Sequence, residues 1–482
     1  MLFNSIDFAI FLPVVFLLYW FAAGKSLRLQ NILLLVASYF FYGSWDYRFM
    51  FLLIFSTILD YFTGIKIHEA KPGRKKTLWL WLSISINLGF LGVFKYFNFF
   101  ASSFAEALSL FGIHADFVTL NVILPVGISF YTFHGLSYVL DLYNDRIRPE
   151  RNFVNYAVFV SFFPLLVAGP IERATHLLPQ IIRKREFTYH KANDGLRQIL
   201  WGLFKKMVIA DNCAAYANEI FNHSGDYSGS TLAVGALFFA FQIYCDFSGY
   251  SDIALGTARL FGIDLLRNFA FPYFARDIAE FWRRWHISLT TWFRDYLYIP
   301  LGGSRGGKWM SVRNTFIVFL VSGFWHGANW TFLVWGLLNA FYFLPLLLFN
   351  KNRQHLEIAA KGKLLPSLRD VSGMAFTFIL TLLAWIFFRA NDVHHAFDYL
   401  SEIFSSSFIT VPQFKGDENV FPVVLLIIFF LIMEWTGREE QYALAGVGRG
   451  WYKPARWAFF YGIAMLIFLF AGKEQAFIYF QF

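Results

Sequence analysis

The sequence contains a stretch of 37 residues, 314–350, without a single Asp, Glu, Lys or Arg. An α-helix rises about 1.5 Å per residue and the hydrocarbon core of a bilayer is about 30 Å thick. The stretch is therefore too long for one membrane crossing and about long enough for two. Arg313 and Lys351 flank it with positive charge. We predict a helical hairpin that lies in a membrane.

His326 is the only group in this stretch that titrates near neutral pH. If the first limb of the hairpin is upright and helical, His326 lies roughly 20 Å from Arg313, beyond the middle of the bilayer. An ionisable group at that depth usually faces the protein interior or a water-filled cavity, and is a candidate functional residue by default. The competing interpretation is a neutral histidine that only forms a hydrogen bond between helices.

Composition extends the membrane assignment to the whole chain. Hydrophobic residues make up 57% of the 482 positions and charged residues 15%. A soluble protein could not bury that much apolar surface, so we predict an all-α polytopic membrane protein with one membrane domain over residues 1–482. The net charge of +9 lies mostly in short loops and is interpreted as an orientation signal in the lipid bilayer, not as a nucleic-acid surface. Cys213 and Cys245 have no disulfide or metal-site spacing and are predicted to be packing residues.

The predicted spans number about eleven to thirteen. Apolar runs lie near 8–23, 30–45, 49–64, 78–100, 117–140, 152–170, 199–221, 231–249, 314–350, 372–389, 420–435 and 457–471. Proline and glycine at 125, 127, 164, 169 and 170 predict broken or re-entrant helices, which are tolerated where they are buried in protein or line a central cavity. The basic loops at 24–29 and 65–76 are predicted to be cytoplasmic, which puts the N-terminus outside. Arg449, Lys453 and Arg456 just before the last apolar run predict that this run starts inside and that the C-terminus lies outside.

The segment 276–309 differs from these runs, because aromatic residues recur there at spacings of three and four between charged ones. This period predicts one amphipathic helix lying in the membrane interface, with His286 on it. It ends in a basic, glycine-rich loop at 299–308, which either contacts phosphates or is a plain cytoplasmic turn. A similar mixture at 171–197 predicts an amphipathic helix on the inner leaflet.

The C-terminal tail, 476–482, is too apolar to lie in water. It can lie among the aromatic residues at the outer membrane surface, or it can insert into the mouth of a cavity. Periodicity alone favours the membrane surface.

Several motifs resemble the membrane-bound O-acyltransferase family, in its bacterial branch that is similar to alginate O-acetyltransferases. They are FPLLVAGPIE at 163–172, QIYCDFSGYSDIA at 242–254, FWRRWHISL at 281–289, RDYLYIPLGG at 294–303, WHGANW at 325–330 and FIYFQF at 477–482. Together they cover nearly the whole chain, and they are too long for chance.

The resemblance implies a bacterial inner-membrane enzyme that takes an acetyl group from cytoplasmic acetyl-CoA, with no permanently bound cofactor and no metal. His326 matches the family's conserved-type histidine and His286 its second polar position. The resemblance further implies a periplasmic serine-hydrolase-like acetyltransferase of the SGNH type as partner, with exopolysaccharide pathway proteins. Arg283, Arg284, Arg305 and Lys308 are the candidates for binding the coenzyme phosphates, unless they serve only as an orientation signal.

The implied chemistry assigns a role to each candidate residue. A neutral imidazole suits a general base that deprotonates an attacking hydroxyl, which we assign to His326. His286 is interpreted as a positioning or catalytic residue, or as a residue that only closes the cavity. A phenol has a pKa of about 10, so its acetyl ester is more activated than an alkyl ester. Tyr479 is therefore a candidate acyl relay.

Two other function classes compete with an acetyltransferase. A lipid or D-alanyl acyltransferase of the same family differs only in the branch motifs. A transporter or channel would share the broken helices, but the sequence has few acids within its apolar runs and no inverted repeat.

Overall fold

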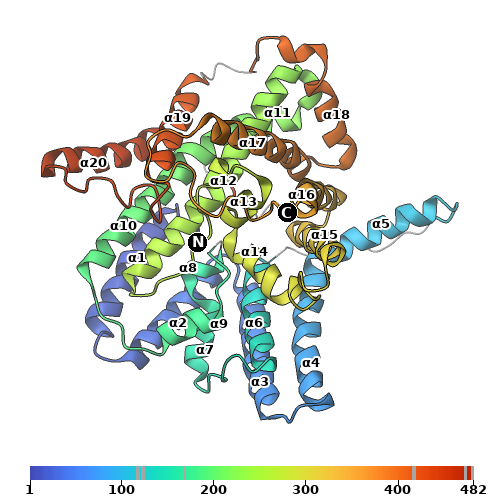
Figure 1. Ribbon diagram of the computed structural model, residues 1–482. Helices are drawn as coiled ribbons and strands as arrows, with labels where there is room; N and C mark the ends of the chain where they lie inside the picture. The colour runs from blue at the N-terminus through green and yellow to red at the C-terminus, as the bar shows by residue number, and fades with distance from the viewer. Residues whose placement is uncertain (115–119, 121–124, 168, 415–419, 472–474, 479–482) are drawn as a thin grey trace. The chain divides into compact units, whose positions relative to one another are not determined.

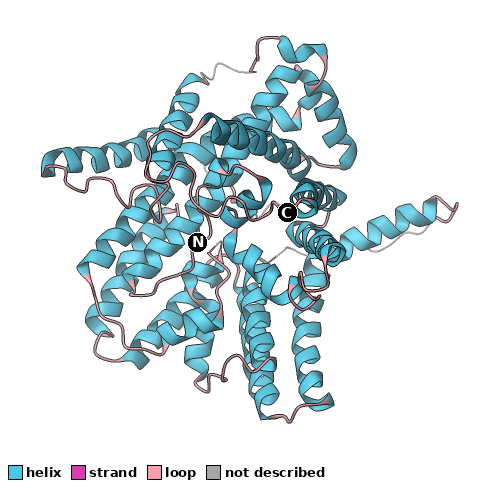
Figure 2. Ribbon diagram, in the orientation of Figure 1, coloured by secondary structure: helices cyan, strands magenta, loops and turns pink. Residues whose placement is uncertain are grey.

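The computed structural model describes residues 1–482 except 115–119, 121–124, 168, 415–419, 472–474 and 479–482. The described residues form helices and loops without a β-strand (Figure 2), which confirms the predicted all-α class. The chain forms two compact units: unit 1 comprises Met1–Ala192 and Thr257–Leu266, and unit 2 comprises Asn193–Gly256 and Arg267–Phe482. The prediction of a single domain stays a prediction.

Unit 1 contains the N-terminal helices. They are α1 (Ile6–Leu17), η1 (Leu18–Ala22), α2 (Leu27–Gly43), α3 (Tyr47–Glu69), α4 (Arg74–Leu91), η2 (Gly92–Tyr96), α5 (Phe97–Ser109), α6 (Ile128–Tyr143), α7 (Phe153–Ser161), α8 (Phe163–Leu166), α9 (Ala174–Ile181) and the start of α10 (Tyr189–Leu203). Helix α3 packs against both α4 and α6, and α2 packs against α7 and α8 (Figure 1). The chain breaks between α7 and α8 at Phe162, just before Pro164, as the prolines predict.

A buried acid joins three helices of unit 1. Asp60 on α3 accepts hydrogen bonds from Ser83 Oγ at 2.6 Å and from Asn87 Nδ2 at 2.9 Å, both on α4. A Cβ atom on Gly135 of α6 would lie 1.9 Å from Asp60 Oδ2, so only glycine allows α6 to come this close. The polar side chains therefore stabilise the packing of these helices where apolar contacts alone give little specificity.

Unit 2 contains the rest of the chain. Its elements are the remainder of α10, η3 (Phe204–Ala210), α11 (Asp211–Asn222), η4 (Ser224–Asp226), most of α12 (Gly229–Leu260), η5 (Pro272–Phe274), α13 (Ile278–Arg284), α14 (Ile287–Phe293), η6 (Arg294–Tyr298), α15 (Lys308–His326), α16 (Trp330–Leu348), α17 (Leu368–Arg389), α18 (Val393–Ile403), η7 (Ser406–Ile409), α19 (Phe421–Thr436) and α20 (Lys453–Phe470). Helices α10 and α12 meet at two glycine pairs. A Cβ on Gly202 would lie 2.6 Å from the carbonyl oxygen of Gly249, and one on Gly256 would lie 2.4 Å from that of Gly195. Close backbone contact of this kind is typical of helices in membranes.

Six helical segments are long and apolar enough to cross a membrane among the residues that the structure describes. They are Tyr47–Glu69, Arg74–Ser109, Gly229–Leu260, Trp330–Leu348, Leu368–Arg389 and Lys453–Phe470. Two shorter apolar helices, Ile6–Ala22 and Phe421–Thr436, add to them. Each of these segments coincides with a predicted apolar run, so the protein is a multi-pass membrane protein as predicted.

The predicted hairpin over 314–350 is confirmed as the pair α15 and α16, which lie side by side (Figure 1). Their backbones approach at two glycines. A Cβ on Gly323 would lie 2.2 Å from the carbonyl oxygen of Phe332, and one on Gly336 would lie 2.4 Å from that of Phe319. The turn begins after His326, and Asn329 caps α16 by accepting a hydrogen bond from the Thr331 N–H at 3.0 Å. Because the glycines allow this close contact next to the turn, they determine the position of His326 at the end of α15.

The predicted continuous interface helix over 276–309 is wrong. The chain forms two short helices, α13 and α14, separated at Trp285 and His286. His286 adopts a left-handed conformation with φ 44° and ψ 54°, which an α-helix cannot contain. Aromatic residues from both helices are buried, so the segment packs within the protein and does not lie with one face exposed.

Candidate active site

His326 is the last residue of α15 and is 4% exposed. Its ring packs edge-on against three aromatic rings, with centroid distances of 4.9 Å to Trp325, 5.1 Å to Trp335 on α16 and 5.3 Å to Phe388 on α17. Helices α15, α16 and α17 therefore all contribute to the walls around this imidazole. An apolar surrounding of this kind favours the neutral form of histidine, which is the form that can accept a proton.

His286 lies at the junction of α13 and α14 and is 1% exposed. Its Nδ1 atom lies 3.0 Å from Oδ1 of Asn268. Ser288 Oγ donates a hydrogen bond to the same Oδ1 at 3.0 Å, and Asn268 Nδ2 donates to Ser251 Oγ at 3.2 Å. Because Oδ1 only accepts, Nδ1 of a neutral His286 carries the proton and Nε2 is the basic nitrogen.

Burial also sets the charge of His286, which lies outside the six membrane-spanning helical segments. Removal from water lowers the pKa of His286 to about 3. The imidazole is therefore neutral throughout the physiological pH range.

The two predicted histidines lie in one aromatic cluster. Trp325 packs against both, with ring centroids 6.1 Å from His286 and 4.9 Å from His326. Trp385 on α17 continues the cluster, with centroid distances of 5.0 Å to Trp285 and 5.9 Å to Trp335. The fold thus brings together two imidazoles that are forty residues apart in the sequence, with one indole ring between them.

The described part of the C-terminal tail enters unit 2. Phe477 and Ile478 are fully buried, so the expectation that the tail lies at the membrane surface is wrong for these residues. The ring centroid of Phe477 lies 4.5 Å from that of Tyr250 and 6.0 Å from that of Phe247, both on α12. Phe247 in turn packs edge-on against His286 at 4.7 Å. Tyr479, the candidate relay, lies outside the described residues.

Two buried lysines form ion pairs in unit 2 that were not predicted. Lys205 pairs with Asp252 at 2.5 Å, and Lys206 pairs with Asp246 at 2.9 Å and with Asp211 at 2.7 Å. Both lysines lie on η3, a π-helical segment, and such segments are frequent at functional sites. The sequence did contain a signal, because charged residues within apolar runs usually have a partner and a function.

A small polar pocket in unit 2 reaches the hydrogen-bond partner of His286. It contains about 310 Å³ of empty space, open solvent included, and its lining includes Lys205, Asp252, Arg267 and Asn268. Asn268, which has no obvious signal in the sequence, therefore connects this pocket to His286.

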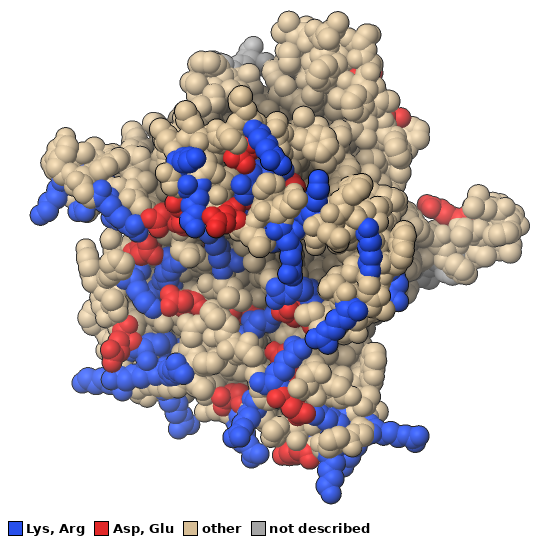
Figure 3. Space-filling model, in the orientation of Figure 1, with Lys and Arg blue, Asp and Glu red and all other residues tan. Residues whose placement is uncertain are grey.

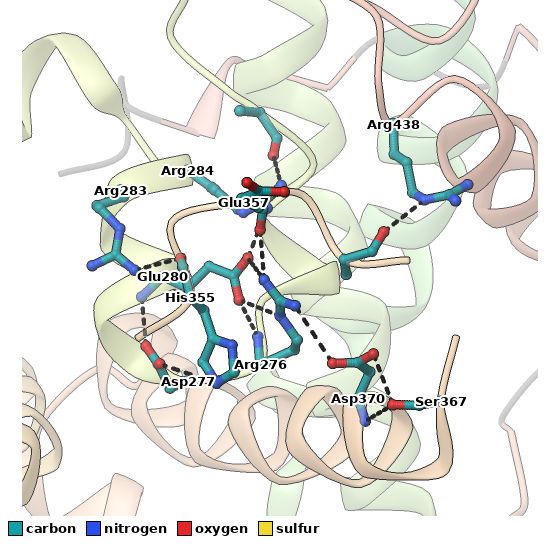
Figure 4. Close-up of polar contacts among 12 residues, drawn as sticks. Arg276, Asp277, Glu280, Arg283, Arg284, His355, Glu357, Ser367, Asp370 and Arg438 are labelled. Carbon is teal, nitrogen blue, oxygen red and sulfur yellow. Dashed lines mark hydrogen bonds and ion pairs between the residues drawn. The ribbon is translucent and has the colours of Figure 1, made fainter. Parts of the chain in front are cut away.

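The four cations predicted for coenzyme phosphates occupy two environments. Arg283 donates hydrogen bonds to the carbonyl oxygens of Asn352 and His355, both at 2.8 Å. Arg284 pairs with Glu280 at 2.7 Å (Figure 4). These two arginines thus bind carbonyl oxygens and a carboxylate of the protein itself. Their role toward the coenzyme stays a prediction.

Arg305 and Lys308 are both exposed, at the end of the glycine-rich loop. Asn314 Nδ2 donates a hydrogen bond to the carbonyl oxygen of Gly303 at 2.9 Å and so holds this loop against α15. Figure 3 shows basic side chains spread widely over the face that it draws, with fewer acidic ones. Such an excess of positive charge suits loops at the cytoplasmic surface of a membrane.

Comparison with known proteins shows the family of the chain. The family model described as MBOAT, membrane-bound O-acyltransferase family, matches residues 15–388. The chain is 35% identical to a probable alginate O-acetylase of Pseudomonas putida, over 100% of both chains. It is 34% identical to a peptidoglycan O-acetyltransferase of Helicobacter pylori, over 100% of this chain and 98% of the relative.

A more distant relative is a teichoic acid D-alanyltransferase of Bacillus subtilis, which is 27% identical over 57% of this chain and 71% of its own length. The family match contains both histidines, and the two O-acetylating relatives align along the whole chain. The chain therefore belongs to the membrane-bound O-acyltransferase family, and it is an O-acyltransferase.

Proposed function

We propose that this protein passes an acetyl group from cytoplasmic acetyl-CoA across the membrane, for O-acetylation of an exported, alginate-like polysaccharide. The observation that carries the proposal is the pair of buried imidazoles, His286 and His326, one indole ring apart in a multi-pass chain of this family. Relatives named alginate O-acetylase and peptidoglycan O-acetyltransferase match the full chain, which supports acetyl as the transferred group.

His326 is the proposed general base. A hydroxyl group attacks the thioester carbonyl while the imidazole takes the hydroxyl proton, and the C–O bond forms as the C–S bond breaks. The proton then passes from the imidazolium to the leaving thiolate, so the transfer consumes no net proton. The aromatic walls formed by Trp325, Trp335 and Phe388 exclude water, which favours transfer over hydrolysis.

His286 is the proposed second polar group. Asn268 accepts a hydrogen bond from the Nδ1 proton, so that Nε2 can accept a hydrogen bond from the hydroxyl group of the acyl acceptor. Its low pKa keeps it neutral, which suits a residue that orients a neutral hydroxyl.

Tyr479 is the proposed acyl relay. Its acetyl ester is activated enough to pass the acetyl group on to a serine hydroxyl. Support comes from its position in the sequence directly after Ile478, because the described tail packs through Phe477 and Phe247 toward His286. The serine belongs to a periplasmic partner of the serine-hydrolase type, which modifies the polysaccharide in the exopolysaccharide pathway.

The donor reaches the site from the cytoplasm. We assign Arg305 and Lys308 to the coenzyme phosphates, because both are exposed and cationic. Arg283 and Arg284, which bind backbone carbonyl groups and Glu280, are the other two candidates for the coenzyme phosphates. This orientation corresponds to a bacterial inner membrane with both termini outside.

A D-alanyl acyltransferase is the second candidate, because a teichoic acid D-alanyltransferase is among the relatives. That relative matches 57% of the chain, whereas the O-acetylating relatives match all of it. Acetylation is therefore the better supported activity.

The test uses purified protein in lipid vesicles with acetyl-CoA labelled in the acetyl group. We expect the label on the C-terminal peptide of the wild type, and its loss in Tyr479→Phe, which keeps the ring but removes the hydroxyl. If Tyr479→Phe still supports acetylation of the polysaccharide in cells, the relay is wrong. If acetyl-CoA is not consumed while D-alanyl thioesters are, the protein is a D-alanyl transferase.

A further inference from the structure

Polar contacts hold the described end of the tail, residues 475–478, in unit 2. Here Phe477 and Ile478 are fully buried in unit 2. Three polar side chains contact the backbone of the segment 470–478. They are Asn212, Lys206 and Asp246, and all three lie on the η3–α11 helix or on α12.

The contacts are directed at backbone atoms. Asn212 Nδ2 donates a hydrogen bond to the carbonyl oxygen of Phe470 at 2.9 Å. Lys206 Nζ donates to the carbonyl oxygen of Gln475 at 3.0 Å, and Asp246 Oδ2 accepts from the Ile478 N–H at 2.7 Å. Backbone contacts fix the register of a segment, whichever side chains it carries.

Lys206 and Asp246 are buried, and each uses part of its hydrogen-bonding capacity on the tail. An ammonium group has three donors. Those of Lys206 face Asp211, Asp246 and the Gln475 carbonyl oxygen. Among the described residues, Oδ1 of Asp246 forms an ion pair with Lys206, and Oδ2 accepts a hydrogen bond from the Ile478 N–H. Without the tail, one donor and one acceptor would be left unmatched in a buried site, which is costly.

The same residues connect the tail to the histidine. Lys206 Nζ lies 5.6 Å from the ring centre of Tyr250, and the Tyr250 ring packs on Phe477. Phe477 packs on Phe247, and Phe247 packs on His286. Tyr479 follows Ile478 directly, and one residue extends a chain by at most about 3.6 Å.

We propose that Lys206 and Asp246 are positioning residues that hold the tail at Gln475 and Ile478, in the register that delivers the Tyr479 hydroxyl to the histidine site. The inference rests on the proposed relay at Tyr479. It adds a specific attachment, which can be measured without any acyl transfer.

The first variant is Asp246→Leu. It removes the acceptor for Ile478 but leaves Lys206 paired with Asp211, so no unbalanced charge is created. Asp246→Asn is the conservative variant, because its amide oxygen can still accept the Ile478 N–H. Glu219→Leu is the matched control: it removes a partly buried acid from α11 that contacts Tyr227 and His223 and has no contact with the described tail.

The first readout is digestion with carboxypeptidase A, followed by the intact mass of the protein. We expect digestion to stop before Ile478 in the wild type, in Asp246→Asn and in Glu219→Leu, and to continue past Gln475 in Asp246→Leu. Equal digestion in all four proteins would overturn the attachment. Thermal unfolding of each variant shows whether digestion reports the tail or loss of the fold, and Lys206→Met serves as a second tail variant if Asp246→Leu does not fold.

The second readout is acetyl label on the C-terminal peptide after incubation with acetyl-CoA. We expect Asp246→Leu to lower the labelling rate at least tenfold, with recovery in Asp246→Asn and with little change in Glu219→Leu. Unchanged labelling in Asp246→Leu, in spite of a released tail, would overturn the positioning role. A wild type without label would overturn the relay instead, while the digestion result would still decide on the attachment.

Discussion

Asn268 and His286 are joined by a contact of 3.0 Å between Oδ1 and Nδ1, within a network that also includes Ser288 and Ser251. The contact determines which nitrogen of His286 is basic. It also connects the polar pocket near Lys205 and Arg267 with the aromatic cluster around the two histidines.

Replacement of Asn268 by Leu should therefore reduce acyl transfer. Because the variant loses the acceptor that orients His286, we expect kcat to fall about tenfold or more, as a part of the 10²- to 10⁴-fold contribution typical of acid–base groups. Asn268 acts through His286, so the double variant Asn268→Leu/His286→Ala should be no slower than His286→Ala alone. Steady-state rates of the three variants test this, and additive losses would contradict it.

The close approach of α15 and α16 makes a second prediction. A methyl group at Gly336 would collide with the Phe319 carbonyl oxygen, which belongs to the backbone and cannot rotate away. Gly336→Ala should destabilise the folded protein by about 1–3 kcal/mol and displace His326. Gly462→Ala on α20, where nothing lies within 4 Å, is the control and should be neutral or slightly stabilising. Thermal unfolding in detergent measures both, and equal melting temperatures would contradict the prediction.

His176 and Glu172 give a pH dependence in unit 1. The hydrogen bond that Nδ1 of His176 donates to Oε2 of Glu172, at 2.8 Å, raises the pKa of His176 above its ordinary value. Because the pKa of His176 is higher in the folded than in the unfolded protein, protonation of His176 stabilises the fold. This stabilisation is fully present below the unfolded pKa of about 6.5 and is lost as pH rises through the folded pKa. His176 is partly exposed, so the effect is below about 1 kcal/mol.

The comparison is between the wild type and His176→Gln, by thermal unfolding across a pH series. The melting temperature of the wild type should exceed that of the variant most at the acidic end of the series, and the difference should shrink toward alkaline pH. A difference that grows with pH would have the wrong sign.

Replacement of the four cations predicted for the coenzyme phosphates should affect different properties of the protein. Removal of Arg305 and Lys308 together should raise KM for acetyl-CoA with little change in stability, and the effect should weaken at high salt, because both side chains are exposed. Arg283→Ala should instead lower the melting temperature, because two carbonyl oxygens lose their donor. If Arg305→Ala/Lys308→Ala leaves KM unchanged, these residues are only an orientation signal.

Much of the fold was predictable because a membrane crossing requires a long apolar helix. The runs near 49–64 and 372–389 became Tyr47–Glu69 and Leu368–Arg389, and the charge-free stretch became the α15–α16 hairpin. His326 was predictable for the same reason, because it is the only group in that stretch that titrates near neutral pH.

The break at His286 was not predictable from periodicity. The aromatic spacing continues across it, and no glycine or proline marks the left-handed residue. The role of Asn268 arises only when the fold brings it to His286, and local sequence contains no trace of that contact. The tail was misassigned because its burial depends on Asp246, which is 232 residues away from Ile478 in the chain.

The most direct test of the central claim is the rate at which His326→Ala transfers the acetyl group of acetyl-CoA in lipid vesicles, compared with the wild type. CoA thiol release and acetyl label on the C-terminal peptide are measured together. With folding verified by thermal unfolding, we predict that both fall by about 10²- to 10⁴-fold, because the general base is gone. A folded His326→Ala protein that transfers acetyl at the wild-type rate would contradict the account.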